Sequence, residues 1–137
     1  MARGTPETSA YDSLIEVSHQ PEWLVVTVRP ATYSWPLGQA ILPAARNALK
    51  TATVRAALVD VREVHGRMST TQRFLMGVYG AALRFPGPLA MVGSEAMVDP
   101  ERFGAVVARS RGAHTEVFTD IDAARQWLAK AIARASA

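Results

Sequence analysis

The chain has 137 residues, 49% of them hydrophobic and 20% charged, which is typical of one folded domain and not of a disordered segment. It has no cysteine, which excludes disulfides, zinc–thiolate sites and thiol catalysis. The formal net charge is only +3, and the arginines are scattered among acidic residues, whereas nucleic-acid-binding surfaces usually concentrate their basic residues. We therefore expect no nucleic-acid partner.

Residues 1–12 are polar and predict a flexible N-terminal segment, followed by a single domain over residues 13–135. The N-terminal segment lacks the apolar core of a signal peptide. The longest uncharged apolar stretch, Phe74 to Leu83, is too short to cross a bilayer. These features predict a cytoplasmic protein that is not an integral membrane protein.

The first part of the chain predicts a hairpin followed by a helix. Leu14 to Val17 and Trp23 to Arg29 are rich in strand-forming residues, and their closeness in sequence predicts antiparallel pairing. Trp35-Pro36 then opens a helical region with an apolar stripe, since proline is well placed in a first turn. Pro43 either bends this helix or marks its true start.

The central stretch, residues 54–85, predicts a buried strand, a polar loop and a helix. The strand is an apolar run from Ala56 to Val64, interrupted by charge only near its end. Ser69 followed by Gln72 matches a capping box, which predicts that the helix begins there. The loop between strand and helix is then expected at the carboxyl edge of the sheet, where α/β proteins usually keep their binding sites.

The last part of the chain continues to alternate strands with helices. The predicted elements are a strand at Pro88 to Gly93, a helix from Asp99-Pro100 to about Arg111, a strand at His114 to Phe118, and a helix that Thr119 and Asp122 cap and that runs through about Ala135. The order β-β-α-β-α-β-α-β-α predicts an α/β fold with four helices and a mixed, mostly parallel five-stranded sheet, in which only the first strand is antiparallel.

Three stretches carry a resemblance to a known family: ALVDVREV as the central strand, PLAMVGS as the next strand, and RGAHTEVFTDIDAARQWL at the end. In the last stretch a glycine is followed by a strand ending in phenylalanine and by a helix with an alanine and a Trp-Leu pair; the matching residues are Gly112, Phe118, Ala123 or Ala124, Trp127 and Leu128. Over Leu14 to Ala131 the chain resembles the STAS domain family of anti-sigma-factor antagonists, in particular its SpoIIAA-like branch. The resemblance implies that fold and a binding or regulatory function, without a reaction.

In the members of this family that act as phospho-switches, the loop after the central strand reads Asp-Ser-Ser-Gly, and the second serine is phosphorylated. Aligned without gaps, this chain has Met68-Ser69-Thr70-Thr71, which places Thr70 at the acceptor position. The flanking aspartate and glycine are both missing. The resemblance therefore offers, as one alternative, a phospho-switch with Thr70 or Ser69 as the acceptor.

The predicted binding site is the loop that leads into the Ser69 helix, together with the loop after the next strand. Free N–H groups and the positive end of the helix dipole favour negative charge at this position, and nearby basic residues add to that field. The same hydroxyls have a simpler interpretation as a helix cap. The candidate ligand- or partner-binding residues are Arg62, His65, Arg67, Ser69, Thr70, Thr71, Arg73 and Ser94.

The helix from Phe74 to Phe85 is apolar on nearly all sides, so it either packs tightly on the sheet or uses a second face. The alternatives for that face are a homodimer contact and the wall of a pocket for a small apolar or lipid-like ligand. Gly77 and Gly80 are costly inside a helix, and we expect the close approach of another backbone to compensate for them.

Catalysis has little support in the sequence. Asp60 and Arg62 share one strand face and predict a structural ion pair. A small enzyme would have to use His65 or Asp60, but no nucleophile–base set accompanies them. The three histidines have no metal-ligand spacing. We therefore expect no enzyme, no metal and no cofactor, and a regulatory domain that binds a protein partner or a small apolar ligand.

Overall fold

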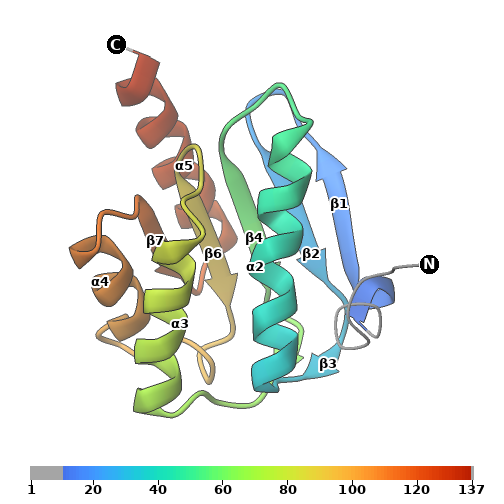
Figure 1. Ribbon diagram of the computed structural model, residues 1–137, viewed down its shortest axis with the longest axis vertical. Helices are drawn as coiled ribbons and strands as arrows, with labels where there is room; N and C mark the ends of the chain where they lie inside the picture. Colours follow the sequence, from blue (N-terminus) through green and yellow to red (C-terminus); the bar gives the residue numbers. More distant parts are fainter. Residues whose placement is uncertain (1–10, 137) are drawn as a thin grey trace.

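The computed structural model describes residues 11–136 of the chain (Figure 1). Its strands are β1 (Ile15–His19), β2 (Leu24–Val28), β3 (Ala31–Thr32), β4 (Ala57–Val61), β5 (Val64–His65), β6 (Leu89–Gly93) and β7 (Thr115–Phe118). Its helices are the short 3-10 helix η1 (Asp12–Leu14) and the α-helices α2 (Trp35–Lys50), α3 (Thr70–Ala82), α4 (Phe103–Ser110) and α5 (Ile121–Ser136). The flexible N-terminal segment predicted for residues 1–12 lies, up to residue 10, outside the described residues.

The main sheet confirms the predicted fold class. Its five strands lie in the order β1-β2-β4-β6-β7. Strands β2, β4, β6 and β7 are parallel, and only β1 is antiparallel, with Ile15 opposite Val28 and His19 opposite Leu24. Each parallel pair is joined by a helical crossover, as parallel strands require. The result is a mixed, mostly parallel five-stranded sheet with four α-helices.

Helices cover both faces of this sheet (Figure 1). On one face, α2 buries Leu37, Ile41 and Ala45 against residues such as Val26 and Val59. On the other face, α5 buries Ala124 and Leu128 against Leu58, Ala90 and Phe118. Because successive strand residues point to opposite faces, β4 supplies Ala57 and Val59 to the first core and Leu58 to the second. Helices α3 and α4 lie beside α2, on the first face.

Helix α2 runs unbroken through Pro43, so the helix does not begin there. It begins at Trp35, where the Ser34 hydroxyl accepts from the Leu37 N–H at 3.2 Å. A proline inside a helix frees the carbonyl four residues earlier, here that of Gln39. The hydroxyl of Tyr79 on α3 donates to this carbonyl at 3.0 Å. The proline therefore creates an acceptor that ties α3 to α2.

The central strand is shorter than the predicted Ala56 to Val64. It stops at Val61, because the Asp60 side chain turns the chain by accepting from the Arg62 N–H at 3.1 Å. Val64 and His65 instead form β5, which pairs in parallel with β3 in a separate two-stranded sheet. Apolar periodicity does not distinguish one long strand from two short ones, so this small sheet was not predicted.

Two helix starts also differ from the prediction. Helix α4 begins at Phe103 and not at Pro100. Before it, the Arg102 N–H donates to the Asp99 carbonyl in a turn. The Asp99 carboxylate accepts from the Phe103 N–H at 3.2 Å. At α5 the cap is Asp120, whose carboxylate accepts from the Ala123 N–H at 2.8 Å. Thr119 lies one residue too early to do this. Helix α3 begins as predicted, with the full Ser69–Gln72 capping box.

Candidate functional site

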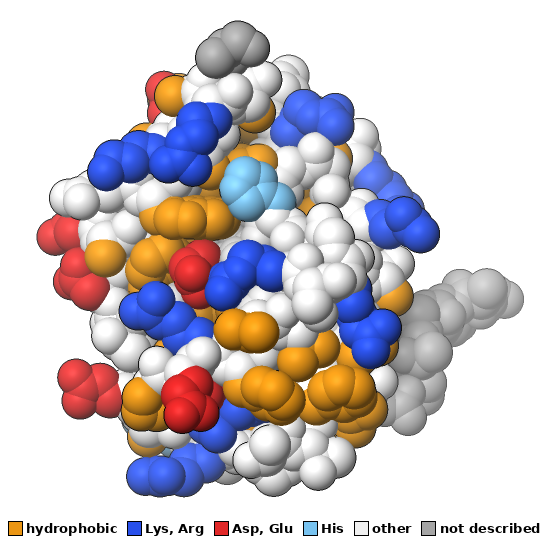
Figure 2. All heavy atoms as spheres, turned by 90° about the vertical axis from the view of Figure 1, so that its left-hand side faces the viewer, with side chains coloured by type: hydrophobic (Ala, Val, Ile, Leu, Met, Phe, Trp, Pro, Cys, Tyr) orange, Lys and Arg blue, Asp and Glu red, His pale blue; other side chains and the backbone are white. Residues whose placement is uncertain are grey.

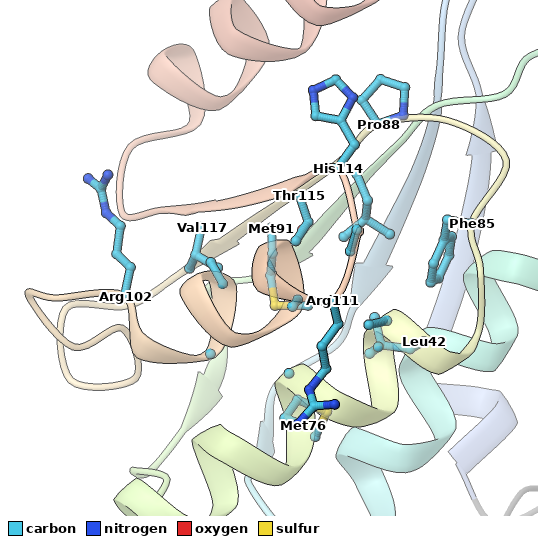
Figure 3. A pocket seen from close by; sticks show the side chains of 18 of the residues that line it. Leu42, Met76, Phe85, Pro88, Met91, Arg102, Arg111, His114, Thr115 and Val117 are labelled. Carbon is cyan, nitrogen blue, oxygen red and sulfur yellow. The ribbon is translucent and has the colours of Figure 1, made fainter.

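A cavity of about 560 Å³ lies between the main sheet and the α3–α4 pair (Figure 3). Its floor is the inner face of the sheet, with Val61, Leu89, Met91, Thr115 and Val117. Its roof is formed by α3 and α4, with Met76, Gly77, Gly80 and Ala81 from the first helix and Gly104, Ala105 and Ala108 from the second. In the close view Leu42, Phe85 and Met91 surround its centre. Ligand cavities in proteins commonly have volumes of several hundred Å³.

Small residues explain why this space is not filled. Most of the roof residues are glycines and alanines, whose side chains are too short to reach the sheet below. Helix α3 makes its main contacts with α4 and α2, not with the strands. As a result Met91 and Val117, which point inward from the sheet, remain only partly buried. Helix α3 therefore lines a pocket along the side that faces the sheet, and a homodimer contact through this helix stays a prediction.

The lining of the cavity is rich in methionine. Within the described part of the chain all four methionines, Met68, Met76, Met91 and Met97, line it. Methionine has an unbranched, polarisable side chain that adapts to ligands of irregular shape. The cavity is therefore lined in part by side chains that can adapt their shape.

Helices α3 and α4 hold each other through glycines. A Cβ atom on Gly77 would lie 2.5 Å from the Gly104 carbonyl oxygen, closer than any real contact. A Cβ on Gly104 would lie 3.2 Å from the Arg73 carbonyl oxygen. The expected close approach of another backbone is confirmed at Gly77. At Gly80 the expectation is wrong, because a Cβ there would meet only the side chain of Leu42, at an ordinary 3.5 Å.

The polar part of the cavity lining is mainly basic. Four arginines contribute to it, and Asp99 is the one carboxylate among the described lining residues. Neither α3 nor α4 contains an aspartate or a glutamate. Figure 2 shows the molecule from the side of α4 and β7, and its acidic side chains lie in the left half of the view, while the half nearer α3 shows basic and hydrophobic side chains. An apolar cavity with a basic rim follows from this arrangement.

Of the eight predicted binding residues, only Arg73 lines the cavity. Its guanidinium lies 3.5 Å from the Asp99 carboxylate and donates to the Met97 carbonyl at 3.2 Å. Ser69 and Ser94 have structural contacts, since the Ser69 hydroxyl caps α3 and the Ser94 hydroxyl accepts from the Met97 N–H at 3.2 Å. The other predicted residues are exposed around the β4–α3 connection: Arg62, His65, Arg67, Thr70 and Thr71. Partner binding by this loop stays a prediction.

Sequence reasoning missed most of the cavity residues. Met91, Met97 and Val117 read as ordinary core positions, and nothing in their periodicity shows that a space lies beside them. Two signals pointed to the cavity: the clustering of methionines between residues 68 and 97, and the small residues that recur along α3 and α4. Either pattern could have indicated a loosely filled helix–sheet interface.

The predicted ion pair between Asp60 and Arg62 is confirmed. The Arg62 guanidinium donates to both carboxylate oxygens of Asp60, at 2.9 and 2.7 Å. Burial disfavours the charged form of Asp60, but the hydrogen bonds from the Arg62 side chain and N–H outweigh this effect and lower the pKa of the carboxyl group. The Asp60 carboxylate therefore has a structural role, because it holds the turn after β4 through Arg62.

The Asp60→Asn variant is expected to lose about 1 kcal/mol of unfolding free energy at neutral pH, because the half-exposed Arg62 loses a charged partner. The folded-state pKa lies below the unfolded one, so this contribution is present above the unfolded value of 3.8 and disappears as the pH falls through the lower, folded-state pKa. Urea unfolding at pH 7 and below pH 3 measures the difference. Asp122→Asn is the control, since its pair with Arg125 is exposed and should give little change at either pH.

Comparisons with known proteins indicate no activity for this chain. No family model matches the sequence, and no curated protein matches it. Among solved structures, the chain is similar to an uncharacterized protein of the DUF3478 family with a SpoIIAA-like fold from Shewanella loihica PV-4. The two chains are 18% identical over 83% of this chain and 91% of the other, with a TM-score of 0.47.

Neither a membrane-spanning helix nor a metal-binding cluster is found among the described residues. No helix between residues 11 and 136 is long and apolar enough to cross a bilayer. In the same range, no group of three histidine, aspartate or glutamate side chains is arranged to hold a metal ion. The described residues thus form an α/β domain with an apolar cavity between its sheet and α3–α4.

Proposed function

We propose that this protein is a non-enzymatic binding domain that takes up a small apolar ligand in the cavity beneath α3 and α4. The observation that carries the proposal is the cavity itself, at about 560 Å³ with a lining of aliphatic and methionine side chains. Burying apolar ligand surface there contributes roughly 25 cal/mol per Å² before the costs of association are subtracted. A regulatory role follows if ligand occupancy changes the position of α3 or α4.

Two other functions have less support. For a phospho-switch, Ser69 is a poor acceptor because its hydroxyl already caps α3, which leaves the exposed Thr70. The aspartate and glycine that flank the serines of the phosphorylated family motif are also missing from this chain.

For a small enzyme, the Asp60 carboxylate already pairs with Arg62, and no hydrogen bond or ion pair among the described residues joins it to His65.

The proposal is tested with N-phenyl-1-naphthylamine, an uncharged dye whose fluorescence rises in apolar surroundings. The folded protein is expected to bind one dye molecule with saturation, and a non-fluorescent apolar competitor such as dodecanol should displace it. Native mass spectrometry of protein purified gently from its own host would show a retained ligand, an added phosphate or a dimer in one spectrum. No saturable dye binding and a bare mass would together rule out the proposed function.

A further inference from the structure

The rim of the cavity carries two arginines in an unusual backbone conformation. Arg84 and Arg102 both have φ of 53°, and they are the only described residues other than glycine with positive φ. Both of them line the cavity. A side chain in this left-handed region costs free energy that glycine avoids, and glycine is the common residue just after a helix end such as that of α3. The turn after α3 alone would favour glycine at position 84, so the arginine found there suggests a role for its side chain.

The two arginines differ in what their side chains contact. Arg102 lies over the Phe118 ring, 5.9 Å from its centroid, and points away from the centre of the cavity in Figure 3. Arg73, at the same end, is neutralised by Asp99. Arg84 makes no ion pair or hydrogen bond through its guanidinium within residues 11–136. The uncompensated charge of the rim is therefore at the Arg84 end.

The fourth arginine of the lining also has a partner for its guanidinium. Arg111 follows the end of α4, and its guanidinium lies 5.9 Å from the Phe74 ring, next to Arg73 and away from Arg84. The carboxyl end of α3 contributes roughly half a negative charge beside Arg84, which one full guanidinium charge exceeds. Among the four lining arginines, Arg84 is therefore the one whose guanidinium has no partner within residues 11–136, and it lies beside an apolar interior.

We infer that the ligand is a single-chain anionic amphiphile, with its carboxylate-type head group at Arg84 and its hydrocarbon chain beneath α3 and α4. This inference rests on the proposed function and adds the chemical class of the ligand. Arg73 and Arg84 lie about three helical turns apart, near the two ends of the cavity, so the space extends roughly 16 Å along α3. A linear chain fits such an elongated space, and a head group at one end can reach solvent beside the exposed Arg84.

The test compares three probes of equal chain length, laurate, dodecanol and dodecylamine, by displacement of N-phenyl-1-naphthylamine below their micelle concentrations. Laurate is expected to bind most tightly and dodecylamine most weakly, and added salt should weaken laurate alone. The Arg84→Gly variant should lower laurate affinity about three- to fivefold, the size of an exposed ion pair, without changing dodecanol affinity. Since glycine suits this backbone, the same variant should melt at a higher temperature than the wild type, which excludes misfolding as the cause.

The matched control is Arg46→Gln, which removes an arginine charge on α2, outside the cavity lining. It should leave all three affinities unchanged. Equal binding of laurate and dodecanol, or loss of laurate affinity in both variants alike, would overturn the inference and leave the apolar binding function intact. Failure of all three probes to bind would instead remove the proposed function with it.

Discussion

Val117→Trp is expected to abolish dye binding, with an affinity loss of tenfold or more, because the indole ring would occupy the cavity. Val117 points from β7 toward the roof and is only partly buried (Figure 3), so space for the ring exists. Filling an empty apolar space also raises stability, here by about 1 kcal/mol. The expected result is therefore a more stable protein that no longer binds, measured by dye titration and urea unfolding of the same preparation.

Val106→Trp provides the matched control for this experiment. Val106 lies on α4 with 45% of its surface exposed and does not line the cavity. The same change of side chain there should leave dye affinity at the wild-type value. If both tryptophan variants bind the dye normally, the ligand site is elsewhere. If both lose binding, the dye reports on the exposed surface of α4 and not on the cavity.

Gly77→Ala is expected to destabilise the protein by about 2 kcal/mol, within the range of overpacked cores. The added methyl group would meet the Gly104 carbonyl oxygen at 2.5 Å and Val107 at 2.9 Å. A backbone atom cannot rotate away, so α4 would have to move from α3. Such a movement also changes the roof of the cavity, and dye affinity should fall together with the unfolding free energy in urea.

Gly80→Ala, one turn later on the same helix, is the comparison variant. Its methyl group would meet only Leu42, at an ordinary contact distance. Alanine is favoured over glycine inside a helix, so this variant should be more stable than the wild type by up to about 1 kcal/mol. Opposite signs for the two glycines are the expected result. Equal destabilisation would contradict the close α3–α4 contact at Gly77.

Local interactions explain why much of the fold was predictable. The Ser69–Gln72 capping box and the Asp60–Arg62 pair involve residues two or three positions apart, so their spacing determines the contact. The hairpin of β1 and β2 and the parallel arrangement of the remaining strands follow from short and helical connections respectively. The order of elements predicted in this way was also part of the basis for the resemblance to the STAS domain family.

The cavity depends on residues far apart in the chain, and only the tertiary structure revealed it. Gly77 and Gly104 meet across two helices, Tyr79 bonds a carbonyl freed by Pro43, and Met91 faces a space that neither its own strand nor its neighbours indicate. The sequence by itself determined the five strands of the main sheet and the four α-helices, apart from some of their ends, because these elements depend on local spacing. How far α3 and α4 lie from the sheet depended on packing between distant side chains, and that distance decided where the candidate site lies.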